Sequence, residues 1–240
     1  MTSISYRIQP LLAFFLSCLA SSSMAANITL LQSKTTLTYS SDVRLSQVLQ
    51  DAHHQLDYEV YPLASGLINP SKQTPVTNVK NSIVTQLQSL QRKDANRLAS
   101  QLTSLSFVFF EPINMDVDKV RVGEKLDPLL KKDYSLSLPR RADHILIVNA
   151  AQDHSTHTPF QTNKGLKPYL TLLPSTQQYS SVWIIQPDRQ VYYVDNIQWR
   201  HQRVFIAPGA TLFFGLRDLP AEHSDLNRRI AKLLALRLEP

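Results

Sequence analysis

The sequence predicts an α+β fold, and three features of the 240-residue chain support this prediction. Short segments that alternate apolar and polar residues occur near the start and again after residue 106, and such alternation is typical of strands. Between them, residues 74–105 place leucine and other apolar residues at helical spacing. The chain ends in a strongly amphipathic segment. Strand-like and helical segments grouped in this way predict a mixed fold.

Residues 1–25 have the pattern of a secretory signal peptide. Arg7 precedes an apolar run over residues 11–20, and the small residues Ser23 and Ala25 suit cleavage after Ala25. The run is about half as long as the roughly twenty residues that a membrane span needs. We therefore expect a periplasmic protein, and an exported protein is not expected to bind nucleic acid. Cys18, the only cysteine, lies inside this segment, so the mature chain is predicted to have no thiol chemistry.

Residues 26–70 are predicted to form part of a first domain. Short β-prone patterns on either side of residues 32–35 suggest a hairpin. The segment 40–52 reads as a helix capped by Ser41, and residues 58–70 return to an extended chain. This unit is too small for a large core of its own, so we expect it to pack against another part of the chain.

Residues 71–105 are predicted to be a helical insertion. Val79, Ile83, Leu87 and Leu90 follow helical spacing, and no glycine occurs between residues 71 and 119. A break is expected around residues 91–95. The apolar stripe is too short for a sustained coiled coil, so it predicts a packing face.

Residues 106–220 are predicted to form a second domain, with some strands returning to the first. The apolar run at 144–150 suits a strand covered on both faces. The turn 187–190 is expected to connect two strands as a hairpin, and Pro208 with Gly209 to form a corner before another strand. Residues 152–165 read as a long polar loop. The predicted strands are 105–110, 117–122, 133–138, 144–150, 169–173, 180–186, 191–195, 203–207 and 210–216.

One candidate ligand site combines acidic, basic and aromatic residues. If residues 117–122 are a strand, Asp116 and Asp118 share a face, a pattern that suits acid/base chemistry or simply a solvated turn paired with Lys119 or Arg121. The guanidinium of Arg121 can form a bidentate hydrogen-bonded contact with a carboxylate, which makes Arg121 the first candidate for recognising an acidic sugar. Tyr193 and Trp199 offer flat apolar faces on which sugar rings stack.

The closing segment, residues 221–240, predicts an amphipathic helix. Apolar residues that include Leu233 lie on one side, and Arg228, Arg229 and Lys232 lie largely on the other. Packing on the parent domain is the default expectation for such a helix. The basic face also makes Arg228, Arg229, Lys232 and Leu233 candidates for binding a partner, or for contact with an anionic membrane surface.

The sequence contains no motif that predicts a cofactor or an enzyme class. G-x-S-x-G, H-E-x-x-H and a phosphate-binding glycine loop are all missing from the 240 residues. His154 and His157 share a loop, but no third ligand is indicated, so we predict no metal site. The net charge of +6 is compatible with acidic sugars or anionic headgroups as ligands. An enzyme that uses Asp116 and Asp118 near Arg121 remains the alternative to a non-enzymatic protein.

Several stretches of the sequence resemble the periplasmic capsule-biosynthesis GfcC-like family. The likeness spans most of the chain after residue 25 and lies in YPLASGLINP, DVDKVRVGEKLDPLLKKDYSLSLPRRADHILIV, VWIIQPDRQVYYVDNIQW, APGATLFFGL and LNRRIAKLLALR. It implies two β-grasp domains related to modules of polysaccharide exporters, a helical insertion and a C-terminal amphipathic helix.

The resemblance also implies a function. Family members are exported proteins encoded with machinery for capsular or O-antigen polysaccharide, so the chain is expected to be a non-enzymatic periplasmic accessory factor. Its expected partners are an outer-membrane polysaccharide exporter or other capsule-assembly proteins, and an acidic polysaccharide. Arg121 matches the arginine of the family's D-x-D-x-x-R stretch, which implies a position in a cleft. The sequence departs from the family at Arg189, where many members have glycine.

Overall fold

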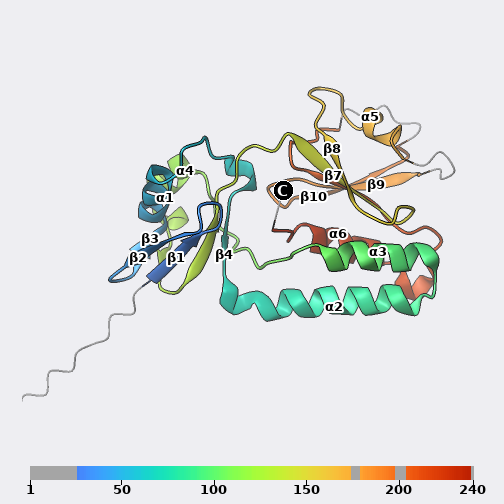
Figure 1. Cartoon of the computed structure of the whole chain (residues 1–240), viewed down its shortest axis with the longest axis horizontal. Helices are drawn as coiled ribbons and strands as arrows, with labels where there is room; N and C mark the ends of the chain where they lie inside the picture. Colours follow the sequence, from blue (N-terminus) through green and yellow to red (C-terminus); the bar gives the residue numbers. More distant parts are fainter. Residues whose placement is uncertain (1–25, 174–178, 198–203, 239–240) are drawn as a thin grey trace, which may run out of the picture.

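The computed structural model describes residues 26–173, 179–197 and 204–238, and every structural statement below refers to these ranges. The predicted signal peptide, with Cys18, lies outside them. Two separate sheets form the two halves of the molecule, and a long helical pair runs beneath the second (Figure 1). The mixed α+β class is therefore confirmed. Within the described ranges, no helix combines the length and apolar character that crossing a bilayer requires.

The first sheet has the strand order β2-β1-β6-β4. The predicted hairpin is present as an antiparallel pair, and a strand from much later in the chain runs parallel to its first strand. Helix α1 packs four apolar side chains against this sheet. The elements are β1 (Ala26–Leu30), β2 (Thr35–Tyr39), α1 (Leu45–His54), β4 (Gly66–Ile68) and β6 (Tyr134–Ser137).

Helix α1 begins later than predicted. Its N-cap is Arg44 and not Ser41, because Val43 and Arg44 form the short strand β3 (Val43–Arg44), which pairs with β5 (Leu129–Leu130). The backbone amide and hydroxyl of Ser46, in the first turn, both donate to the carboxylate of Asp127, at 2.8 Å each. A carboxylate from a distant loop thus accepts a hydrogen bond from an amide in the first turn, a role that we predicted for the nearby Ser41.

The second sheet has the order β10-β9-β11-β7-β8. Strands β7 and β11 form a parallel pair at its centre, and the other pairings are antiparallel. The predicted hairpin across residues 187–190 joins β9 to β10. The strands are β7 (His144–Asn149), β8 (Thr156–Pro159), β9 (Ser181–Ile185), β10 (Val191–Asp195) and β11 (Thr211–Phe214).

Both sheets share one connection pattern. Each starts with an antiparallel hairpin, continues through a helix, and later returns a strand that runs parallel to the first strand of the hairpin. In the first sheet the returning strand is β6, and in the second it is β11. The chain therefore builds the same small topology twice, with the helical pair placed inside the first copy.

The predicted helical insertion is an antiparallel pair, α2 (Gln73–Ser89) and α3 (Lys93–Ser104), and its break at residues 90–92 overlaps the predicted 91–95. Gln91 at the break has a positive φ of 51°. The pair packs with the terminal helix α6 (Leu226–Leu234) against one face of the second sheet, where they share one buried apolar cluster. Figure 1 shows α3 and α6 between this sheet and α2.

The segment APGATLFFGL forms the corner and the last strand of the second sheet. Gly209 has a φ of 85°, which favours glycine, and all four residues of β11 are buried. Phe213 is 0% exposed and lies in the cluster with α6, so the helix covers it. Asn227 of α6 accepts a hydrogen bond from the amide of Leu216 and donates one to its carbonyl, at 2.9 and 2.8 Å. These bonds hold the helix at the exit of the strand.

Four strand predictions were wrong, and in two the cause is a helix start signal. Asp116 caps α4 (Val117–Val122), where a strand was predicted, and Pro168 lies in the first turn of α5 (Lys167–Leu170), which overlaps the start of the predicted strand 169–173. Residues 105–110 are an extended connection with isolated bridges, and 204–207 form no strand. The loop predicted at 152–165 in turn contains the edge strand β8.

Candidate functional site

The predicted acidic pair does not form a catalytic arrangement, because Asp116 and Asp118 lie at the start of a helix. The carboxylate of Asp116 accepts hydrogen bonds from the backbone amides of Asp118 and Lys119, at 3.2 and 3.3 Å. It also forms an ion pair with the Lys119 ammonium at 3.1 Å. The hydrogen bonds from Lys119 lower the pKa of Asp116, which keeps it ionised. Asp116 thus caps and pairs locally, as a solvated turn does.

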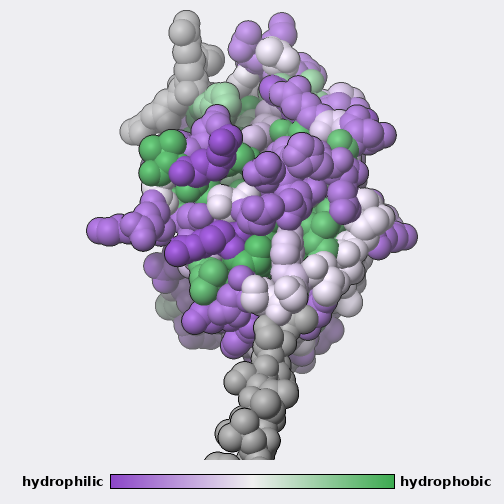
Figure 2. Space-filling view, turned by 90° about the vertical axis from the view of Figure 1, so that its left-hand side faces the viewer, coloured by the Kyte–Doolittle hydropathy of each residue, from purple (hydrophilic) through white to green (hydrophobic). Residues whose placement is uncertain are grey.

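Arg121 is exposed on α4 and is not among the described residues that line the cavities of the structure. Figure 2 faces the end of the molecule that carries α1 and α4. Hydrophilic side chains there separate the hydrophobic areas from one another. Val122, next to Arg121, is 90% exposed, so apolar and charged side chains lie side by side at this helix.

The predicted aromatic ligand residue Tyr193 lies far from α4, on the edge strand β10 of the second sheet (Figure 1). Its ring contacts Trp183 of the neighbouring strand, with ring centroids 4.7 Å apart. Tyr193 and its neighbour Tyr192 are both more than half exposed, because β10 has no neighbour on its outer side. The predicted ligand residue Trp199 lies outside the described residues.

The four residues predicted to bind a partner have different environments. Leu233 is only 1% exposed and belongs to the core, so it is removed from the predicted docking surface. Arg229 donates to the side-chain oxygen of Gln86 at 2.7 Å and to Ser82 at 3.2 Å, both on α2. Arg228 and Lys232 are exposed. The apolar face of α6 packs on its own sheet, which is the default that the sequence predicted.

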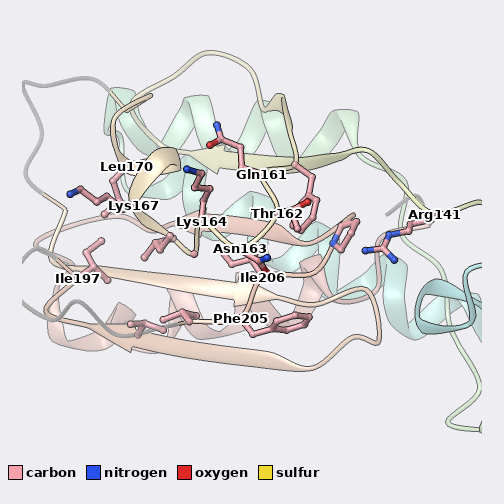
Figure 3. A pocket seen from close by; sticks show the side chains of 16 residues that line it. Arg141, Gln161, Thr162, Asn163, Lys164, Lys167, Leu170, Ile197, Phe205 and Ile206 are labelled. Atoms are coloured by element: carbon pink, nitrogen blue, oxygen red, sulfur yellow. The ribbon is translucent and has the colours of Figure 1, made fainter.

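A large cleft lies on the face of the second sheet opposite the helical pair. Its volume is about 880 Å³ (Figure 3). One wall is the loop that follows β8 together with α5, and the other is formed by the ends of β10 and the segment that leads to β11. Apolar side chains form much of its lining: Phe160, Leu166, Leu170, Val194, Ile197, Val204, Phe205, Ile206 and Pro208.

The polar part of this basic cleft consists of cations and neutral donors. Arg141, Lys164 and Lys167 contribute positive charge, and no aspartate or glutamate is among its described lining residues. None of the three cations forms an ion pair with a described residue. Gln161 and Asn163 add amide groups. The charge of the cleft is therefore not neutralised within the described parts of the protein.

Buried groups hold both walls of the cleft in place. The hydroxyl of Tyr169, whose ring is fully buried, accepts a hydrogen bond from the amide of Gln161 at 2.8 Å. On the other wall, the side chain of Gln186 donates to the carbonyl of Phe205 at 2.7 Å and accepts from the amide of Ala207 at 3.0 Å. Phe205 is nevertheless 75% exposed. Its ring is thus presented to solvent from an anchored backbone.

A partly buried arginine joins the two sheets, a role that we did not predict from the sequence. Arg189, in the turn between β9 and β10, donates to the carbonyl of Ser65 at 3.1 and 3.2 Å, just before β4 of the first sheet. Its guanidinium lies 3.6 Å from the ring centroid of Phe110. Burial lowers the pKa of Arg189 to about 10, so it stays charged at neutral pH. A Cβ on Gly66 would collide with both Arg189 and Phe110, so this close approach requires glycine.

The sequence did contain a signal for this contact between the two sheets: Arg189 stands where many members of the family have glycine. Arg189 has a φ of 70°, a conformation in which glycine is favoured. An arginine that accepts such backbone strain is expected to make contacts that offset it. Among the described residues, no group of three or more histidine, cysteine, aspartate or glutamate side chains is placed to hold a metal ion.

Comparison with known proteins identifies both halves of the chain. Residues 22–141 match the family described as capsule biosynthesis GfcC, N-terminal, and residues 154–239 match capsule biosynthesis GfcC C-terminal. The chain is also similar to the uncharacterized protein YjbG of Escherichia coli strain K12, with 26% identity over 125 residues. That alignment covers 51% of this chain and 51% of YjbG, so the chain spans about half the length of this curated relative.

Proposed function

Because the chain belongs to the capsule biosynthesis GfcC family, we propose that it is a non-enzymatic periplasmic accessory protein for assembly or export of a capsular or O-antigen polysaccharide. The observation that carries this proposal is the match of both family halves, at residues 22–141 and 154–239. We propose that the protein acts by contact with an outer-membrane exporter, with the glycan, or with both.

We further propose that the two sheets are β-grasp units of the kind found in polysaccharide exporters. The repeated connection pattern supports this, because in each sheet a hairpin, a helix and a returning parallel central strand follow one another. A protein with such units could dock beside similar units of an exporter. Arg228 and Lys232, exposed on α6, remain candidates for that contact. Attachment of α6 to a membrane is less favoured, because its apolar face is already buried.

The non-enzymatic role is supported by what the candidate catalytic groups already do. Asp116 caps a helix and pairs with Lys119, and Asp118 and Arg121 are exposed on the same short helix. General acid/base catalysis needs a group within hydrogen-bond reach of a bound substrate. The large cleft offers cations and amides, which bind and orient an anion.

Deletion of the gene tests this proposal. We expect less polysaccharide on the cell surface, while the pools of sugar precursors stay at or above the parental level, since an assembly factor acts after precursor synthesis. Complementation with the intact gene should restore the surface polysaccharide. A deletion strain with a normal polysaccharide layer would contradict the proposal. Incubation of the purified protein with that polysaccharide should release no new reducing ends, and their appearance would favour an enzyme.

A further inference from the structure

We infer that the basic cleft of the second sheet binds a segment of an acidic polysaccharide chain, with Arg141, Lys164 and Lys167 contacting its negatively charged groups. This inference rests on the proposed function and names the glycan class and the residues that bind it. Neither the acidic pair on α4 nor the terminal helix is part of this site.

Charge is the first argument. Three cations line one cleft, without a carboxylate among its described lining residues and without an ion pair to a described residue. Like charges repel one another, so such a group is unfavourable unless solvent or an anion compensates it. Guanidinium and ammonium groups form strong, charge-assisted hydrogen bonds with carboxylates and phosphates. The cleft therefore selects for an anionic ligand.

The distribution of the cations favours a chain over a single headgroup. Arg141 and Lys167 lie toward opposite ends of the cleft, and Lys164 lies between them (Figure 3). One phosphate or carboxylate cannot contact both ends at once. A polymer that carries a charge at regular intervals can contact each cation with a different unit. Amide and hydroxyl groups of Gln161, Thr162 and Asn163 lie along the same wall and suit sugar hydroxyls.

The apolar lining favours a carbohydrate among the possible polyanions. Sugar rings present C–H faces that pack on aromatic and aliphatic side chains. Phe205 is 75% exposed, yet the hydrogen bonds of Gln186 to the Phe205 carbonyl and from the Ala207 amide fix the backbone of this segment. Tyr192 lies two positions before the cleft residue Val194 on β10, so both point to the same face of the sheet. Because this backbone is fixed, stacking of a sugar on the exposed ring orders only the Phe205 side chain.

Binding of defined oligosaccharides to the purified protein tests the inference. The probe is an oligogalacturonate, a linear chain of uronic acids, and the comparison ligand is a neutral malto-oligosaccharide of equal length. We expect the acidic ligand alone to bind measurably in calorimetry, with affinity that falls as salt is added. The double variant Lys164→Gln, Lys167→Gln should bind it about tenfold more weakly, since each exposed charge contact contributes modestly.

A matched variant separates the site from the overall charge. Lys125→Gln combined with Lys132→Gln removes the same number of charges from exposed positions outside the cleft and should leave the affinity within about twofold of the parent. Phe205→Ala should weaken binding without changing the salt dependence, because it removes a stacking surface and no charge. Unfolding curves should show that all variants fold like the parent.

Three outcomes would overturn the inference. Equal binding of the acidic and neutral ligands would show that the cleft does not select for negative charge. If both double-lysine variants weakened binding equally, the effect would come from the net charge of the protein and not from the cleft. Failure to bind the acidic ligand, combined with cleft-dependent binding to phosphatidylglycerol vesicles, would assign the cleft to a lipid headgroup. The proposed function fails separately: a normal polysaccharide layer after gene deletion would refute it even if the cleft binds oligogalacturonate.

Discussion

The two sheets share a connection pattern but differ in how they are covered. In the first sheet, β1 alternates buried and partly exposed residues, and α1 packs on one face only. In the second sheet, β7 has five buried residues in succession, and β11 has four. One face of the second sheet carries α2, α3 and α6, and the other carries α5 and the segments around it. The same topology therefore supports a small half-covered sheet and a larger sheet whose central strands are covered on both faces.

This difference shows which half of the protein depends on the helical insertion. The helices α2 and α3 are inserted inside the first copy of the pattern, yet their apolar residues join the core of the second. The insertion thus covers the second sheet on one face and leaves the opposite face to form the cleft. Mutations can test this division, beginning with the core of the second sheet.

Phe213→Ala should have the largest effect on stability. The side chain is fully buried between β11 and the helices, and truncation of such a ring costs about 3–5 kcal/mol. Thr29→Ala, on the half-exposed side of the first sheet, is the matched change and should cost less than about 1 kcal/mol. Urea unfolding of both variants measures the difference. Similar losses would show that the two sheets are not covered differently.

Arg189→Ala should have the next largest effect, because Arg189 links the two sheets. The variant loses the hydrogen bonds to Ser65 and the contact with Phe110, and we expect a loss of about 2 kcal/mol. Gly66→Ala should disturb the same joint through its collision with Arg189. Limited proteolysis between the halves should become faster in both variants. Unchanged stability and proteolysis would show that the sheets are held together by other contacts.

Asn227→Ala should destabilise the protein by about 1–2 kcal/mol, because both backbone groups of Leu216 lose their partner on α6. Hydrogen exchange should report the effect locally, in α6 and at the end of β11. Arg228→Ala, on the exposed side of the same helix, is the control and should change stability by less than about 0.5 kcal/mol. Equal exchange rates in the two variants would contradict the role of Asn227.

The smallest effect is expected at Glu111, near the first sheet, and it depends on pH. Burial acts to raise its pKa, but hydrogen bonds from Asn69 and Lys72 outweigh burial, so the pKa is lowered. A carboxyl with a lower pKa in the folded state stabilises the protein above its unfolded pKa of about 4.3, and this contribution is lost as pH falls through the folded pKa. Glu111→Gln should therefore be less stable than the parent at pH 7 and nearly equal to it at pH 3, by urea unfolding.

Periodic segments of the sequence were enough to predict much of this architecture. The continuous apolar run of β7, the hairpin of β9 and β10, the helical pair and α6 all have patterns that burial enforces directly. The strand prediction for VDKVRV was wrong because the alternation of this segment also fits a short helix. The interaction that decides between the two is the N-cap at Asp116. In APGATLFFGL, glycine and alternation predicted the corner and the strand, but only the tertiary structure shows that Phe213 is covered.

The basic cleft could not be predicted from the sequence, because its cations come from separate parts of the chain. Arg141 precedes the second sheet, while Lys164 and Lys167 follow β8, more than twenty residues later. The segment NKG does contain a local signal, because asparagine and glycine are the residues that most readily adopt a positive φ. Asn163 and Gly165 both have a φ of 59°, and Lys164 lies between them. From the sequence we predicted this segment only as part of a polar loop, and Arg121 as the first candidate for binding an acidic sugar.

The most direct test of this account is the amount of polysaccharide on cells in which the gene is replaced by the variant Lys164→Gln, Lys167→Gln. At equal protein levels, we predict a reduced polysaccharide layer in this strain and a normal layer with Lys125→Gln, Lys132→Gln. Equal, normal layers in the two strains would contradict the claim that the cleft of the second sheet carries the contact with the glycan.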